Sequence, residues 1–193
     1  MPWVKSFNID ETLDIAMRMF WSRGYEATSM QDLVQGMGIN RGSLYDTYGD
    51  KRSLFIAALR HYDKAHRKTR LAKLEREHSP KVAIEALFVD WIDLVTTDAD
   101  RRGCFLTNTA LELSVHDAEI GAIVATSQKE TEQFFRRLIK RGQSIGKIDQ
   151  DLDATQSARL LLAALIGLLV LARSRPERTL LKSIASSAMG SLQ

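Results

Sequence analysis

The segment at residues 28–54 has the sequence T-S-M-Q-D-L-V-Q-G-M-G-I-N-R-G-S-L-Y-D-T-Y-G-D-K-R-S-L. It predicts two short helices joined by a glycine turn, with a further helix starting directly after Gly49. Thr28 and Gln31 have the spacing of a capping box at the start of the first helix, and Asn40 caps the second. The second helix is too short and too polar to be a core helix. A polar helix that is capped at both ends is typical of a helix held out for a partner.

The N-terminal end of this second helix has side chains that suit a DNA-recognition helix. Such a helix enters the major groove with its first residues at the base edges. Arg41 can pair with a phosphate or form two hydrogen bonds with guanine, Gly42 allows a close backbone approach, and Ser43 offers a small hydroxyl. Leu44 faces the opposite way, into a three-helix core. The alternative is that Arg41 and Tyr45 are ordinary surface residues of a helical bundle.

The two flanks of this segment suit contacts with the DNA backbone. The helix start at Thr28 and Ser29 offers amide groups and the positive end of a helix dipole to a phosphate. Tyr48 and Lys51 lie beside the start of the following helix. Most contacts of this kind position a protein on DNA, and only a few of them specify the base sequence.

The whole pattern, T-x-M-x-D-L-V-x-G-M-G-I-N-R-G-S-L-Y-D-T-Y-G-D-K-R-S-L-F, resembles the signature of the tetracycline-repressor (TetR) family of bacterial transcriptional regulators. The resemblance covers about residues 8–60. Three positions depart from the family pattern: Gly36 stands where alanine is usual, Thr47 where histidine is common, and Tyr48 where phenylalanine is common.

The resemblance implies a homodimeric repressor whose N-terminal domains bind a palindromic operator in double-stranded DNA. It also implies a variable C-terminal domain that binds a small-molecule inducer, so that transcription regulation responds to that ligand. The DNA contacts that the resemblance implies are Thr28, Arg41, Gly42, Ser43, Tyr45, Tyr48 and Lys51.

The charge of the chain is unevenly distributed. The 193 residues have a formal net charge of +3, with 13 Lys and Arg against 9 Asp and Glu in residues 1–76. Residues 77–193 have 14 Lys and Arg against 15 Asp and Glu. The basic excess in the first part fits a nucleic-acid-binding surface, and a solvated basic face would have the same composition.

Three features predict a cytoplasmic protein. A single cysteine excludes an intramolecular disulfide and indicates a reducing compartment. The N-terminus lacks the charged and then apolar pattern of a signal peptide. The longest apolar run, residues 160–172, has 13 residues, whereas a membrane span needs about 20. We therefore expect this run to be a buried helix, with no membrane partner.

Apolar residues recur at helical spacing almost throughout, and there is hardly any strand signal. We predict an all-α fold of about nine helices. Residues 1–50 would form a helix-turn-helix DNA-binding domain, residues 51–76 a connecting helix, and residues 77–193 a C-terminal domain for ligand binding and dimerisation. Further helices are predicted near residues 80–97, 103–114, 117–142, 153–174 and 177–190.

The helix at residues 160–172 is apolar around its whole circumference and must be covered on every side. It is either the central core helix of a monomer or part of a dimer interface, and the family resemblance favours the dimer. In the family the last two helices of each subunit commonly form a symmetric four-helix bundle. The predicted interface residues are Leu161, Ala164, Leu165, Leu168, Leu181 and Ile184.

The remaining C-terminal helices are expected to enclose the inducer, in a mostly apolar pocket with a few polar groups. The candidate lining residues are Trp91, Cys104, Phe105, Asn108, Phe134 and Leu138. Cys104 follows Arg101 and Arg102 at a predicted helix start, and both the cations and the helix dipole favour a thiolate. The G-C-x-L sequence at this place resembles that of several family members, some of which sense oxidants or electrophiles through the cysteine. The alternative is that Cys104 is a small buried hydrophobic residue.

An enzyme and a ligand-binding protein are the two alternative classes of function. An enzyme is disfavoured because the chain has no phosphate-binding glycine loop, zinc-spaced Cys/His cluster or nucleophile elbow. We therefore expect no catalytic residue, no metal and no cofactor. A helical small-molecule-binding protein without a DNA role is the second alternative, and the capped polar helix argues against it.

Overall fold

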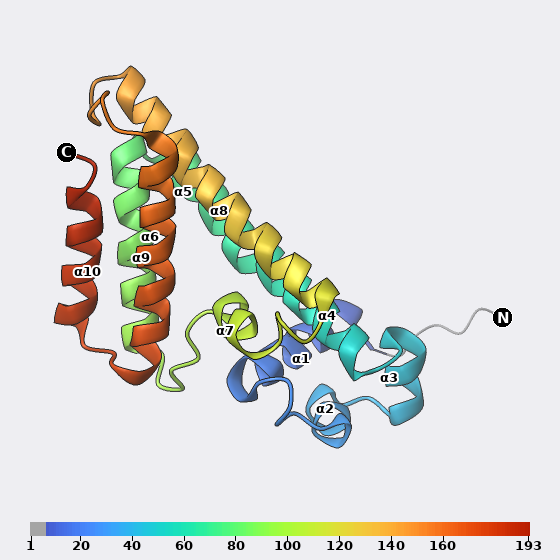
Figure 1. Ribbon diagram of the computed structural model, residues 1–193. Coiled ribbons are helices and arrows are strands. Elements are labelled where there is room, and N and C mark those ends of the chain that lie inside the picture. Colours follow the sequence, from blue (N-terminus) through green and yellow to red (C-terminus); the bar gives the residue numbers. More distant parts are fainter. Residues whose placement is uncertain (1–6) are drawn as a thin grey trace. The chain divides into compact units, whose positions relative to one another are not determined.

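The computed structural model describes residues 7–193 and, within them, contains helices and no strand (Figure 1). The chain divides into two compact units, residues 1–66 and residues 67–193. Each unit has its own buried core and is described by itself.

The first unit contains α1 (Ile9–Arg23), α2 (Met30–Met37), α3 (Arg41–Tyr48) and α4 (Lys51–Tyr62). Polar caps begin α1, α3 and α4, as the sequence predicted for Asn40, and glycines end the first three helices. The side chains of Asn8, Asn40 and Asp50 accept backbone hydrogen bonds at the starts of α1, α3 and α4. Gly38 ends α2 in the left-handed conformation, with φ of 66°, which costs glycine little.

The start of α2 corrects one prediction. The capping box is formed by Ser29 and Asp32, not by Thr28 and Gln31. The Asp32 amide donates to Ser29 Oγ at 3.1 Å, and Asp32 Oδ2 accepts from the Ser29 amide at 2.8 Å. Hydrogen bonds that the Ser29 hydroxyl and then the Ser29 amide donate to the Asp32 carboxylate hold the pKa of Asp32 below its usual value. Both pairs of residues have the required three-residue spacing, and the structure has Ser29 at the N-cap position of α2.

Aromatic rings fill much of the core of the first unit. Phe20 packs edge-on against Phe55, with ring centroids 5.0 Å apart, and Tyr25 meets Phe55 at 5.1 Å. Trp21 packs against Tyr62 at 5.0 Å. Such pairs contribute about 0.5–1.5 kcal/mol beyond the area that they bury, so α1 and α4 form a firm support for the two short helices.

The stretch predicted as one helix at residues 51–76 is helical throughout, but its winding changes along its length. After α4, residues Asp63–Lys68 form a π-helical segment, and α5 then runs over Thr69–Glu77. The boundary between the two units falls within the π-helical segment, after His66. Counting this stretch as one helix gives nine within the described residues. The π-helical winding has no signal that we recognised in the sequence.

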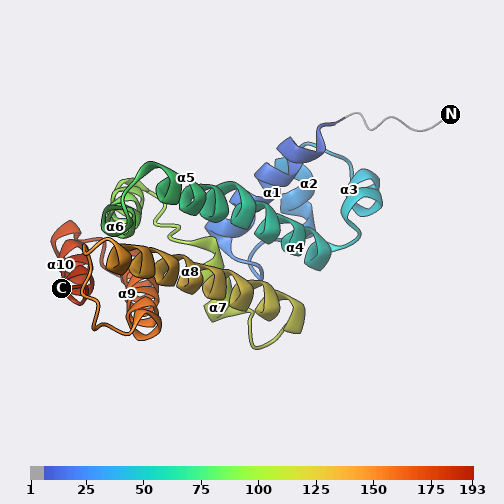
Figure 2. The ribbon, with the colours of Figure 1, turned by 90° about the horizontal axis from the view of Figure 1, so that it is seen from above.

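The second unit continues with five further helices, close to the predicted ranges. They are α6 (Pro80–Thr97), α7 (Phe105–Glu112), α8 (Ala118–Ser144), α9 (Ala154–Ser174) and α10 (Arg178–Gly190). Helices α6, α9 and α10 lie beside one another, and Figure 2 views this group nearly end on. The long α8 packs across α9 and α6, and α7 packs against α8.

By length and composition, α9 is the one helix within residues 7–193 that could cross a membrane. In this structure it packs against α6, α7, α8 and α10. Its Arg159 forms an ion pair with Glu132 of α8 at 3.2 Å. Contacts on several sides favour a core helix, in keeping with the short apolar run in the sequence.

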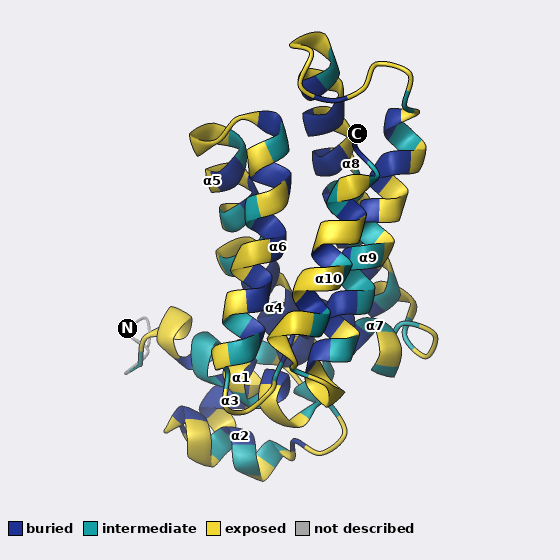
Figure 3. Ribbon diagram, turned by 90° about the vertical axis from the view of Figure 1, so that its left-hand side faces the viewer, coloured by how far each residue is buried: buried dark blue, intermediate teal, exposed yellow. Residues whose placement is uncertain are grey.

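The faces of α9 and α10 correct the predicted interface set. Four of its members, Leu161, Leu165, Leu168 and Leu181, are buried within their own chain. Ala164 and Ile184 are half-buried. The apolar residues that α9 leaves open are instead Leu160 and Val170, which are 50% and 37% exposed, with Ala163 between them in the sequence. Figure 3 colours the helices by burial. Periodicity alone did not say which stripe of an all-apolar helix faces outward.

Candidate nucleic-acid interface and ligand cavity

Helix α3 presents an open polar face on a buried anchor. Asn40 Oδ1 accepts a hydrogen bond from the Ser43 amide at 2.8 Å and fixes the start of the helix. Leu44 is completely buried, whereas Arg41, Gly42 and Tyr45 are exposed. The anchor therefore holds the first turn of α3 with its basic and aromatic side chains toward solvent.

Arg41 and Tyr45 stand one turn apart on this face. The Arg41 Cζ atom lies 5.6 Å from the centre of the Tyr45 ring, and Tyr45 is 41% exposed. This contact is loose and exposed, which leaves both side chains available for a partner.

Two of the predicted contact residues have hydroxyls that turn inward. Thr28 is completely buried, and its hydroxyl donates to the Gly24 carbonyl at 2.7 Å. Ser43 is also buried. The exposed hydroxyl at the start of α2 belongs to Ser29, the N-cap of that helix.

Tyr48 and Lys51 are half-buried and lie against the unit's own residues. The Tyr48 hydroxyl donates to the Ile9 carbonyl at 3.1 Å and shares a 2.9 Å hydrogen bond with Thr12. Burial raises the pKa of Tyr48. Lys51 Nζ lies 4.3 Å from the centre of the Tyr25 ring. Tyr48 therefore ties the end of α3 to α1, and Lys51 is held at the start of α4.

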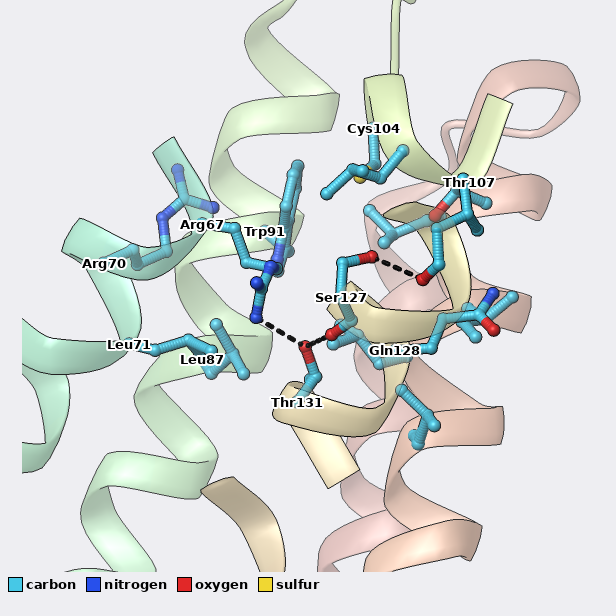
Figure 4. Close-up of a pocket in the computed structure, with 16 residues that line it drawn as sticks. Arg67, Arg70, Leu71, Leu87, Trp91, Cys104, Thr107, Ser127, Gln128 and Thr131 are labelled. Carbon is cyan, nitrogen blue, oxygen red and sulfur yellow. Dashed lines mark hydrogen bonds between the residues drawn. The ribbon is translucent and has the colours of Figure 1, made fainter. Parts of the chain in front are cut away.

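The second unit encloses a cavity of about 60 Å³ (Figure 4). Its walls come from the π-helical segment and from α5 to α9. Trp91 and Cys104, both predicted, line it. Most of the other walls are apolar. The lining residues are Arg67, Arg70, Leu71, Leu87, Trp91, Cys104, Leu106, Thr107, Val124, Ser127, Gln128, Thr131, Leu162, Leu165, Ile166 and Leu169.

The other four predicted pocket residues do not line this cavity. Phe105, Phe134 and Leu138 are buried in the packing between helices. Asn108 uses its amide to donate to the Arg102 carbonyl at 2.7 Å. The cavity residues that sequence reasoning missed come from several helices. Ser127 and Thr131, four residues apart on the inner face of α8, were the one signal that could have pointed to polar walls.

Arg67 joins the cavity wall to α8 through an ion pair and a hydrogen bond. Its guanidinium pairs with Glu130 and donates to Thr131 Oγ1 at 3.4 Å (Figure 4). Partial burial acts to raise the pKa of Glu130, but the hydrogen bond and charge of Arg67, together with Lys68, outweigh burial and lower that pKa. An ionised carboxylate thus fixes Arg67 against α8.

Cys104 occupies the N-cap position of α7 and is 7% exposed. Its neighbour Arg102 is paired with Asp98 at 2.9 Å. Burial acts to raise the pKa of Asp98, but hydrogen bonds from Arg102 outweigh burial and lower it. The thiol is buried, and it lies on the wall of the cavity.

Within residues 7–193 no group of three His, Cys, Asp or Glu side chains is placed to hold a metal ion. The two features that stand out are an open helix-turn-helix face in the first unit and a mostly apolar cavity in the second. Together they define a helical DNA-binding regulator with a separate C-terminal unit.

Comparison with known proteins gives the family. The model of the bacterial regulatory proteins of the tetR family matches residues 13–58. The model of the tetracyclin repressor-like C-terminal domain matches residues 80–187, which is more than half of the chain. The chain belongs to the tetR family, and it is a DNA-binding transcriptional regulator.

Full-length relatives agree with this assignment. The chain is 32% identical over 170 residues to an uncharacterised helix-turn-helix transcriptional regulator of Bacillus subtilis, YezE, covering 88% of each chain. It is 30% identical over 186 residues to the Escherichia coli transcriptional repressor ComR, covering 96% of this chain and 89% of the relative.

A solved structure shows a similar protein bound to DNA. A cysteine mutant of the TetR-family regulator CifR, in complex with a 26-base-pair double-stranded operator, superposes with a TM-score of 0.87. The two chains are 29% identical, and the match covers 99% of this chain and 100% of the other.

Proposed function

We propose that the protein is a homodimeric repressor that binds a palindromic operator through α3 and the start of α2. The exposed first turn of α3 carries this proposal, because Leu44 anchors the helix while Arg41, Gly42 and Tyr45 face outward. The operator complex of CifR and the repressor ComR support it. Lys51 and the helix start at residues 28–29 would hold the DNA backbone, and Ser43 and Tyr48 would position α3.

A palindromic operator requires two reading helices at a fixed separation, about 34 Å or a multiple of it. We propose that α9 and α10 provide the dimer interface that sets this distance. The open residues of α9, with Ala164 and Ile184 at the margin, would meet the same face of a second chain. Leu161, Leu165, Leu168 and Leu181 would support that face from within.

We propose that the cavity of the second unit receives the inducer, or that modification of Cys104 on its wall replaces an inducer. Ligand binding or Cys104 modification must stabilise one state of the dimer relative to the other. The coupling free energy for such an effect is typically about 1–3 kcal/mol. The favoured state would hold the two α3 helices at a separation that does not fit the operator.

The functional division of the chain follows from this proposal. Residues 1–50 would read DNA, residues 51–76 would connect, and residues 77–193 would bind the ligand and dimerise. We place the protein in the cytoplasm, with no membrane partner, and assign it no catalytic role. The family membership favours this function over that of a ligand-binding protein without a DNA role.

The salt dependence of duplex binding tests the proposal. Because bound phosphates release counterions, the affinity for the protein's own upstream DNA should fall steeply as salt increases. Tyr45→Ala should weaken that binding while the thermal unfolding curve stays unchanged, and the exposed Arg76→Ala, in the second unit, serves as the matched control. A flat salt dependence, or equal binding by Tyr45→Ala and the wild type, would contradict the proposal.

A further inference from the structure

The cavity of the second unit has a cationic wall. Its lining includes Arg67 and Arg70 and no carboxylate. Arg67 also pairs with Glu130, as does Lys68 beside the cavity. Arg70 is therefore the cationic lining residue to consider for a ligand.

Arg70 supplies the charge that is not balanced. Its Cζ atom lies 4.6 Å from the centre of the Trp91 ring. Within the part of the chain that the structure describes, no carboxylate lies within ion-pair distance of this guanidinium. Arg67, by contrast, is engaged by Glu130 and Thr131.

Arg70 lies over the Trp91 ring. A guanidinium that packs on an aromatic ring keeps N–H groups for a second partner. Those N–H groups match the two oxygens of a carboxylate in a bidentate hydrogen-bonded pair. Figure 4 shows Arg70, Arg67 and Trp91 on one side of the cavity, with Thr107 and Gln128 on the other.

The rest of the cavity limits the size and polarity of a ligand. The hydroxyls of Ser127 and Thr131 already donate to the carbonyls of Val124 and Ser127, at 2.7 and 2.9 Å. The remaining wall is mostly Leu, Ile and Val side chains. A volume of about 60 Å³ corresponds to roughly four water molecules, at about 10–15 Å³ each.

We propose that this cavity binds a small aliphatic carboxylate, with the carboxylate on Arg70 and the hydrocarbon chain against the apolar wall. This inference rests on the proposed function, in which the same cavity receives the inducer, and it adds the chemical class of that ligand. A short chain of a few carbons fits the present volume, and a longer one requires the side chains of α9 to move.

Calorimetric titration of the full-length protein with butyrate and with butyramide tests this inference. The two probes have the same size and shape, and only butyrate carries a charge. At constant ionic strength, we expect butyrate to bind at least roughly tenfold more tightly than butyramide, because a hydrogen bond to a charged group is the stronger one. Equal binding of the two probes would overturn the proposal.

Substitutions assign the effect to Arg70. Arg70→Gln should remove the preference for butyrate, and Arg70→Lys should retain only part of it because lysine lacks the planar fork. Arg76→Gln is the matched control, since Arg76 lies on the same helix, outside the cavity, and pairs with Glu77. Unchanged butyrate binding by a folded Arg70→Gln would overturn the assignment. If that variant does not fold, the comparison of the two probes on the wild type still decides.

Operator binding measured on the same samples separates this inference from the proposed function. Absence of binding by every carboxylate from acetate to hexanoate, with normal operator binding, would overturn the ligand class alone. Absence of sequence-specific DNA binding, with tight butyrate binding, would overturn the repressor and leave the carboxylate site in place.

Discussion

The two units of the chain use polar side chains in opposite ways. In the first unit, Arg41 and Tyr45 stand on the outside of a short helix whose inner side is anchored by Leu44. In the second unit, Arg67 and Thr131 turn inward and form part of the wall of a cavity. An outward polar face suits a large partner such as DNA, and an inward one suits a small ligand. Because the two groups of side chains lie in different units, substitutions should be able to change the α3 face and the cavity wall separately.

The largest effect is expected from the anchor of the reading helix. Leu44→Ala removes a completely buried side chain and should destabilise the first unit by about 2–5 kcal/mol, with loss of operator binding. Urea unfolding followed by circular dichroism measures this change. Leu111→Ala, at a residue that is 69% exposed in the second unit, should change stability by less than about 0.5 kcal/mol. Equal effects of the two substitutions would remove the distinction between anchor and surface.

A smaller effect, on binding alone, is expected from the open face of α3. Arg41→Ala should weaken operator binding by about 1–3 kcal/mol if Arg41 contacts a base, and it should leave the unfolding midpoint unchanged because Arg41 is exposed. Fluorescence anisotropy with a labelled duplex measures the affinity. Arg76→Ala again serves as the control. A loss of stability in Arg41→Ala would show that the face is structural and would break the comparison.

Two glycines of the first unit give opposite expectations. Gly38 has φ of 66° at the end of α2, so Gly38→Ala should destabilise the unit by about 1 kcal/mol. Gly36 lies within α2, where alanine is favoured by about 0.5–1 kcal/mol. The new Cβ would lie 2.4 Å from Met19 Sδ, and the flexible methionine can move aside. We therefore expect Gly36→Ala to be neutral or slightly stabilising in a thermal melt. Destabilisation by Gly36→Ala as large as that of Gly38→Ala would show that Met19 is fixed.

The smallest effect concerns the inward ion pair of the second unit. The pKa of Glu130 is lowered in the folded protein from its ordinary value of 4.5, so its ionised form stabilises the fold above that pH. This stabilisation should fade as the pH falls through the lowered pKa. The side chain is 38% exposed, so solvent screening limits the contribution to less than about 1 kcal/mol.

The comparison of wild type with Glu130→Gln measures this contribution. The difference in unfolding free energy between the two proteins should be largest near neutral pH and should shrink in acid. A difference that grows as the pH falls below 4.5 would contradict the assigned role of Glu130.

The first unit was largely predictable from its sequence because its structure is local. Asn40, Gly49 and Asp50 act on residues within three or four positions, and such caps leave a readable pattern. The exception, Thr28 in place of Ser29, arises because two adjacent residues have the same chemistry. Backbone conformation, which the sequence does not state, decides between them.

The second unit was predictable in its helices and less so in its site. Trp91 and Cys104 line the cavity, whereas Phe105 and Asn108 do not. A cavity formed by several helices depends on how those helices rotate about their axes, and helical periodicity leaves this rotation open when a helix is apolar on every face. The same ambiguity placed Leu161 on the outside of α9 instead of within the chain.

A binding-site selection with the purified full-length protein tests the central claim most directly. Random duplexes that the protein retains should converge on a palindrome, with half-sites separated by about one helical turn or a multiple of it. The enrichment should disappear for Tyr45→Ala and persist for Arg76→Ala. Retention of duplexes without a shared sequence, or the same enriched palindrome for wild type and Tyr45→Ala, would contradict the account that α3 reads DNA.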